Sequence, residues 1–273
     1  MGGYMLNNKT EAEIVIDFSK ANTYPVEIKE LINASFGELS DENRRCIISK
    51  SVRYPADVGA AIERYYSSFR QDELYKSCKK ILMNYSVVAF HATRILTPQS
   101  ITEHGLKTNN PDNYQEFLGG ALNAIGLSGK EKSKILSLVE HEYLRKTGSS
   151  NASTLCFFAS LEQMDGGDIA GYDQFCQNVG GELARWALQS KYPQILQALK
   201  TIGLPVVVEF LLPFSDIPRY EMDTVVYKFI QYYAAKHFWQ YHYPIEFDSH
   251  ISFDIPPEQI IRIHPYTKIL NYE

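Results

Sequence analysis

Apolar positions along this chain recur with two periods, one typical of helices and one typical of strands. From residue 26 to residue 85 the spacing is mostly helical, which predicts a mainly helical N-terminal region at 1–85. Beyond it, short apolar runs predict buried strands. These runs lie at 87–90, 154–160, 205–212 and 260–264, and the segment 243–253 alternates like a half-buried strand.

Helical spacing returns between the predicted strands. It predicts helices at 118–144 with a break near 126–129, at 183–199 with an interruption at Pro193, and at 222–239. The Asn-rich stretch 107–116 is expected to be a loop, because Pro111 and Asp112 are turn signals. This mixture of strands and helices predicts an α+β fold, with the larger domain at 86–273.

One predicted strand ends in polar residues. The run Val87-Val88-Ala89-Phe90 leads directly into His91, Ala92 and Thr93. Buried strands of mixed folds often present functional groups at their ends, so His91 is a candidate ligand-binding residue. The alternative is a structural histidine, which is the commoner role for a lone histidine on an apolar strand.

A short helix is expected directly after this strand. Pro98 fits its first turn, Thr97 fits its cap, and Gly105 fits its end.

Composition narrows the class of protein. The chain has 273 residues and a net charge of −5, so no strong basic field indicates nucleic-acid binding. Its four cysteines form no CxxC pair, and the sequence shows no signal peptide and no apolar run of membrane length. We therefore expect a cytoplasmic protein with reduced thiols. The sequence contains no phosphate-binding glycine loop, zinc-ligand cluster or serine nucleophile elbow, so we expect no metal.

Aromatic residues mark the end of the strand predicted at 154–160. Phe157-Phe158-Ala159-Ser160 closes this strand, and Tyr172 follows it. An aromatic face can hold a flat ligand, although phenylalanines on a strand are more often part of the core.

Acidic residues occur at two further places of interest. Gly180-Gly181 permits a close backbone approach, and Glu182 lies in the first turn of the helix that follows. Its carboxylate either complements the helix dipole or faces a ligand. Near the C-terminus, Glu246 and Asp248 lie on the strand predicted at 243–253, ahead of an Ile-Pro-Pro turn and a last apolar strand.

Together these motifs resemble the ADP-ribosyltransferase superfamily, in its His-Tyr-Glu branch, over about residues 85–268. The order of the His-x-Thr strand, the aromatic-aromatic-Ala-Ser strand and the C-terminal acidic strand carries the resemblance, which implies a split sheet with flanking helices. The chain is similar in particular to bacterial toxin and phage-defence ADP-ribosyltransferases.

The resemblance implies NAD as co-substrate and assigns roles to the first two motifs. His91 would hydrogen-bond a ribose hydroxyl, the backbone of Ala92 would hold the carboxamide, and Thr93 would support the strand end. Phe158 or Tyr172 would pack on the nicotinamide, and Ser160 belongs to the same motif. The usual first tyrosine of the second strand is Phe157 here, so stacking is retained and any hydroxyl role is lost.

The resemblance also implies a catalytic carboxylate on the C-terminal strand. Cleavage of NAD creates an oxocarbenium-like ribose, which a carboxylate stabilises. Glu246 is the first candidate by position and residue type, Asp248 is the second, and Glu182 is held in reserve.

The acceptor stays open. An intracellular macromolecule is expected, with nucleic acid favoured over protein, and a toxin or anti-phage effector of this kind would need a neutralising antitoxin partner. Two alternatives remain. One is an RNA 2′-phosphotransferase, which uses a histidine and several arginines, and Arg94 follows His91 closely. The other is a catalytically dead ADP-ribosyltransferase fold that acts as a binding module.

Overall fold

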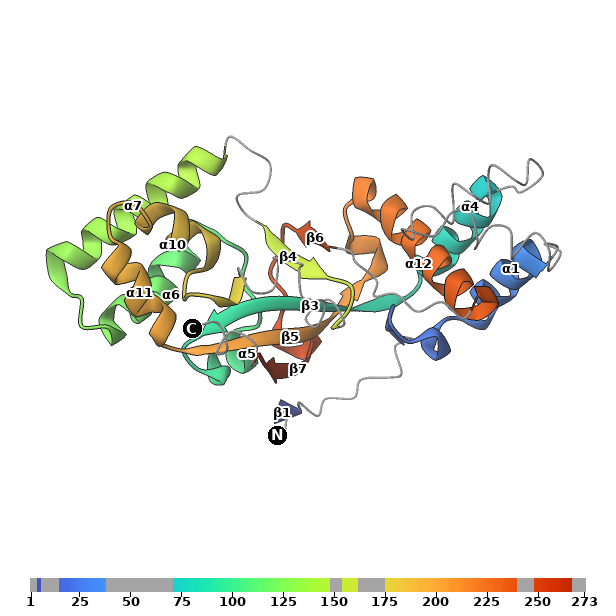
Figure 1. The fold of residues 1–273 in the computed structure, drawn as a ribbon, viewed down its shortest axis with the longest axis horizontal. Helices are drawn as coiled ribbons and strands as arrows, with labels where there is room; N and C mark the ends of the chain where they lie inside the picture. Colours follow the sequence, from blue (N-terminus) through green and yellow to red (C-terminus); the bar gives the residue numbers. More distant parts are fainter. Residues whose placement is uncertain are drawn as a thin grey trace.

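Strand β3 (Ser86–Ile95) lies in the middle of the sheet around which the molecule is built (Figure 1). The structure is a computed structural model that describes residues 4–5, 15–37, 71–147, 154–161, 175–239 and 248–266. Within these residues the sheet has seven strands in the order β1-β7-β5-β3-β4-β6, and β2 pairs with β3 off this path. Among the strand pairings of these residues, only that of β2 with β3 is parallel. The other strands are β1 (Tyr4–Met5), β2 (Val15–Ile16), β4 (Leu155–Phe158), β5 (Leu204–Pro213), β6 (Asp248–Ile251) and β7 (Ile260–Pro265).

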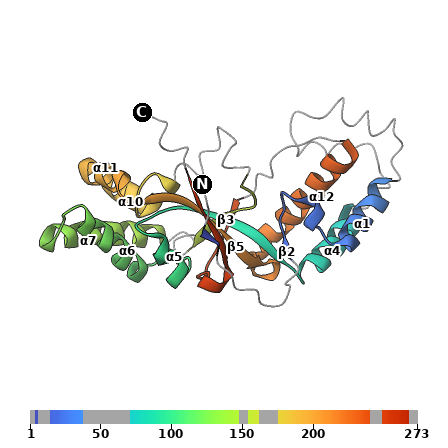
Figure 2. The same cartoon turned by 90° about the horizontal axis from the view of Figure 1, so that it is seen from below.

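Helices gather in two groups at opposite ends of the long strands β3 and β5 (Figures 1 and 2). One group consists of α6 (Pro111–Ala124), α7 (Gly129–Thr147), α10 (Gly181–Leu188) and α11 (Pro193–Thr201). The other consists of α1 (Val26–Gly37), α4 (Gln71–Leu82) and α12 (Arg219–Trp239). Short 3-10 turns lie at Ala21–Thr23, Phe214–Asp216 and Pro257–Gln259. None of the helices in the described segments is long and apolar enough to cross a membrane.

Burial divides the interior into three clusters. The largest joins α1, α4 and α12 to one face of the sheet, so that Ile28, Leu82 and Phe229 belong to the same core as Val87 and Phe210. The second fills the space among α6, α7, α10 and α11. The third covers the opposite face of the sheet and includes Val88, Phe90 and Phe158. Antiparallel strands with helices at both ends confirm the predicted α+β class.

The segment after β3 follows the sequence prediction closely. Helix α5 (Pro98–His104) begins at the proline, and Gly105 ends it with a φ of 72°. A side chain at Gly105 would place its Cβ 1.9 Å from the carbonyl oxygen of Ile255, so only glycine fits there. Thr97 occupies the cap position, but its side chain makes no capping hydrogen bond.

The predicted loop at 107–116 is wrong in its second half. Helix α6 begins at Pro111, and the Asn110 side chain caps it by accepting a hydrogen bond from the backbone N–H of Asn113 at 2.9 Å. Proline is as compatible with the first turn of a helix as with a turn, because the N–H that it lacks has no partner inside the helix there. The break predicted near 126–129 does separate α6 from α7.

Two other predicted elements differ in extent. The helix expected at 183–199 is interrupted over four residues, because α10 ends at Leu188 and α11 begins at Pro193. Within the described residues, the strand expected at 243–253 is the short edge strand β6, which spans Asp248–Ile251.

Candidate functional site

His91 has a defined tautomer. Its Nδ1 lies 2.7 Å from the backbone carbonyl oxygen of Cys156 on β4. A carbonyl oxygen can only accept a hydrogen bond, so the proton is on Nδ1. Burial lowers the pKa of His91 to about 4, although the hydrogen bond to Cys156 acts in the opposite direction. At neutral pH the ring is therefore uncharged, and Nε2 carries a lone pair that can accept a hydrogen bond from a ligand hydroxyl.

The face of the sheet decides which aromatic residue accompanies His91. Phe90 lies directly opposite Phe158 in the pairing of β3 with β4, and paired residues share a face. Successive residues on a strand alternate between faces, so His91 and Phe157 lie on the other face. Phe158 is buried in the cluster of Phe90. Its ring packs edge-on against the ring of Phe175, with the ring centroids 6.1 Å apart. The structure therefore brings Phe157, rather than Phe158, to the face of His91.

Ala92 lies beside a gap in the strand ladder. In the described part of the chain, β3 pairs with β5 along its whole length, whereas its pairing with β4 is limited to Phe90 and Phe158. The carbonyl of Cys156, two residues before Phe158, accepts its hydrogen bond from the His91 imidazole. The side of Ala92 that faces β4 thus has no strand partner among the described residues, and Ala92 itself is 1% exposed in the cluster of Phe90.

The other predicted residues of the two motifs lie at different depths. Thr93 is partly exposed on the face of His91, two residues further along β3. Ser160 is fully buried just beyond β4. Tyr172 and Glu246 lie outside the described residues.

Two of the three candidate acids lie near the Cys156 side chain, which shares the face of Phe158 and not the face of His91. The pKa of the Cys156 thiol is raised to about 11 by burial and, to a lesser degree, by the negative charges of Glu182 and Asp248. Both carboxylates are therefore close to Cys156, although they come from the start of α10 and from β6. Asp248 is paired with Phe158, so its side chain leaves the sheet on the face opposite His91.

Glu182 is held by two cations. Its carboxylate lies 3.4 Å from Lys146 Nζ and 3.6 Å from an Arg185 guanidinium nitrogen. The same Lys146 ammonium lies 3.0 Å from the centroid of the Trp186 ring. Glu182 is thus oriented by neighbours on α7 and α10, which fixes the position of its charge beside β4.

Arg94 is a structural residue. It is 5% exposed, and its guanidinium donates hydrogen bonds of 3.0 Å to the backbone carbonyls of Cys176, Ile202 and Gly203. These bonds join β3 to the segment before α10 and to the turn between α11 and β5. The guanidinium is consequently occupied, and it is not available to bind a phosphate. An arginine in an otherwise apolar strand was the only sign of this role in the sequence.

The described residues contain no group of three or more His, Cys, Asp or Glu side chains that could hold a metal ion. Comparisons with protein-family models, with curated proteins and with solved structures found no match for this chain.

Proposed function

We propose that this chain is an NAD-dependent ADP-ribosyltransferase with an ADP-ribosyltransferase-like fold. The observation that carries the proposal is the His91 imidazole, which is neutral, has its proton on Nδ1 and leaves the Nε2 lone pair as a hydrogen-bond acceptor. A ribose hydroxyl is the complementary donor. The Ala92 backbone beside it would hold the carboxamide. Phe157 lies on the same face as His91, but it is buried in the core at 1% exposure.

The proposed reaction also requires a catalytic carboxylate. Breaking the bond between nicotinamide and ribose leaves positive charge on the sugar, and a fixed carboxylate stabilises that charge. Glu182 has the best-defined surroundings of the described candidates, and Asp248 is the acid on the C-terminal strand. Glu246 remains the candidate that the sequence motif favours.

The acceptor that we propose is a macromolecule inside the cell, with nucleic acid favoured over protein. An effector of this kind would act as a toxin or in antiviral defence and would need a neutralising partner. The 2′-phosphotransferase alternative is less well supported, because the arginine nearest His91 is committed to three backbone carbonyls. A binding module without catalysis remains the second candidate, because the His91 acceptor would suit NAD binding alone.

Labelled NAD tests the proposal. The protein is incubated with NAD labelled in its adenylate part, together with DNA, RNA or protein extract, and both nicotinamide release and covalent label are measured. Transfer of label to one acceptor class supports the proposal. Binding of NAD without release of nicotinamide contradicts it and supports the binding module.

Three variants identify the acid. Glu182→Gln, Asp248→Asn and Glu246→Gln each remove one charge with little change in size. The catalytic carboxylate should lower the transfer rate by about 10²–10³ when neutralised, while NAD binding persists. Full activity in all three variants would contradict a carboxylate-dependent mechanism. His91→Asn should weaken NAD binding, because asparagine retains a donor for Cys156 and loses the acceptor at Nε2.

A further inference from the structure

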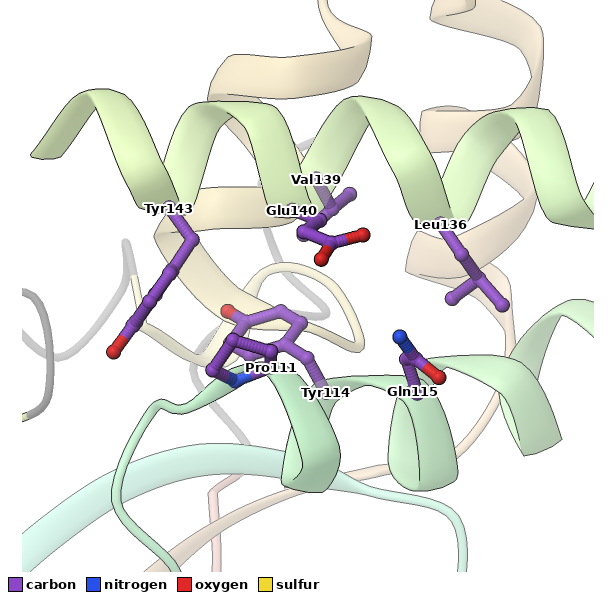
Figure 3. Close-up of a pocket in the computed structure, with 7 residues that line it drawn as sticks. All are labelled: Pro111, Tyr114, Gln115, Leu136, Val139, Glu140 and Tyr143. Carbon is purple, nitrogen blue, oxygen red and sulfur yellow. The ribbon is translucent and has the colours of Figure 1, made fainter. Parts of the chain in front are cut away.

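Two features of the described surface lie away from His91. One is a hollow between α6 and α7, lined among others by Tyr114, Leu136 and Val139 (Figure 3). It has room for about one water molecule, so it takes no larger ligand. The other is a charged cluster on the sheet, which consists of Lys20, Glu209, Arg262 and His264.

Glu209 and His264 form the centre of the charged cluster. Glu209 lies in the middle of the otherwise apolar strand β5. Its carboxylate lies 2.7 Å from His264 Nε2 on β7, and the two side chains are 15% and 21% exposed. A carboxylate in a strand that pairs on both sides loses much of its hydration, so it needs a partner, which His264 supplies. Both side chains still keep some contact with solvent, so a ligand can reach the pair.

The register of β5 against β7 brings a cation to the same place. Arg262 lies directly opposite Glu209, so their side chains share a face of the sheet. His264, two residues further along β7, lies on this face as well. Phe90 lies opposite Glu209 on β3, so the cluster is on the face of Phe90 and not on that of His91. The ladder shifts its register directly after Glu209, and such bulges often re-aim side chains next to functional sites.

Lys20 adds a second cation to the cluster. It follows strand β2, and its ammonium donates a 2.5 Å hydrogen bond to Asp17. This bond is the main cause of the raised pKa of Lys20, and the charges of Glu209 and Arg262 act on that pKa as well. Lys20 must therefore lie near both side chains. Its own side chain is 62% exposed, so the ammonium can turn towards a ligand.

His264 has the arrangement of a general base. A carboxylate only accepts hydrogen bonds, so the proton between the ring and Glu209 is on Nε2. In the neutral ring, Nδ1 then carries the lone pair. A carboxylate that orients one nitrogen of a histidine while the other nitrogen takes up a proton is a recurring catalytic pair. The two cations beside it can stabilise the negative charge that develops on a phosphate during transfer.

We propose that the charged cluster cleaves RNA, whose 2′-hydroxyl supplies the nucleophile. Nδ1 of His264 takes the proton of the 2′-hydroxyl, the 2′-oxygen forms a bond to the adjacent phosphorus, and the bond from phosphorus to the 5′-oxygen breaks. The leaving 5′-oxygen takes a proton from water, and His264 gives its proton to the hydroxide that remains. The products are a 2′,3′-cyclic phosphate and a 5′-hydroxyl. Arg262 and Lys20 would bind the phosphate. The proposal goes beyond the transferase function, because it concerns a different reaction on the opposite face of the sheet.

A short RNA and the DNA of the same sequence test the proposal. Each strand carries a fluorescent 5′ label and is incubated with the full chain, with EDTA and without NAD, so the result is independent of the transferase proposal. We expect cleavage of the RNA alone, because DNA lacks the 2′-hydroxyl. Mass spectrometry of the 5′ fragment should show a 2′,3′-cyclic phosphate.

Variants locate the activity, and thermal unfolding verifies that each of them is folded. His264→Gln keeps a donor for Glu209 and removes the base, so it should lower the cleavage rate by about 10²–10⁴. His104→Gln, at an exposed histidine at the end of α5, should cleave at the wild-type rate. Glu209→Gln should lower kcat with little change in KM, because this carboxylate orients the base and does not touch the substrate.

Three results would contradict the proposal. Intact RNA after incubation with the wild type would show that the charged cluster has only a structural role. Cleavage of the DNA would mean that the 2′-hydroxyl is not the nucleophile. Equal cleavage rates for His264→Gln and His104→Gln would identify a host ribonuclease carried through the purification, since such a contaminant acts equally in both preparations.

Discussion

Replacing His91 with asparagine should make the stability of the protein less sensitive to acid. The folded protein resists protonation of His91, because burial lowers the pKa of its ring to about 4, whereas the unfolded chain takes up a proton near pH 6.5. Between these two values the unfolded state binds more protons than the folded state. Stability therefore falls as the pH falls through this window, and the full contribution of the neutral ring is present above pH 6.5.

The magnitude follows from the two pKa values. The lowering of the pKa from 6.5 to about 4 removes about 3 kcal/mol from the free energy of unfolding once the pH is below both values. About 2 kcal/mol of this loss has occurred at pH 5. Asparagine does not titrate, and its side-chain amide can still donate to the Cys156 carbonyl. The variant should thus lack this part of the pH dependence while it keeps the local contact.

Urea unfolding of both proteins at pH 7.5 and pH 5.0 measures the effect. Other groups titrate equally in the two proteins, so the difference between their pH-dependent losses isolates His91. We expect the wild type to lose about 2 kcal/mol more than His91→Asn between the two pH values. An equal loss in both proteins would refute the lowered pKa of His91 and the burial of its ring that causes it.

Two further predictions concern the backbone around the site. Arg94→Met should destabilise the fold by about 3–5 kcal/mol, because three buried carbonyls lose their donor. The control Arg145→Met, at an exposed position, should change stability by no more than about 0.5 kcal/mol. Urea unfolding of both variants measures the difference. Gly203→Ala should cost at least about 1 kcal/mol more than Gly126→Ala in the same assay. Both glycines have positive φ, but only at Gly203 would the new Cβ collide with a neighbour, at 2.5 Å from the carbonyl oxygen of Ile95. Equal costs for the two alanine variants would mean that the turn before β5 can shift.

Local signals in the sequence were sufficient for the elements around His91. The apolar run ahead of His91 became β3, and the proline and glycine that bracket α5 define its ends, because each acts through its own backbone geometry. A local signal was misleading at Pro111, where a loop was predicted and helix α6 begins, because proline fits both a loop turn and the first turn of a helix. Asn110 was the discriminating residue, since its side chain can cap a helix.

The arrangement of the site depended on contacts between distant segments. Which of Phe157 and Phe158 accompanies His91 follows from the register of β4 against β3, and no property of either segment alone fixes that register. In the sequence, Arg94 was the arginine near His91 that the 2′-phosphotransferase alternative would need. Its three acceptors come from segments far along the chain, so its structural role was visible only after folding.

The pairing of β3 with β5 has a consequence for how the protein folds. This longest ladder joins Ile95 to Leu204 and Ser86 to Pro213, so the chain must close a very large loop before the central strand gains its main partner. Helices α6, α7, α10 and α11 lie inside that loop, and they can form early from contacts near in sequence. A high contact order of this kind slows folding. The helical bundle would therefore form on the nascent chain while β3, which carries His91, is still unpaired, because β5 is synthesised much later.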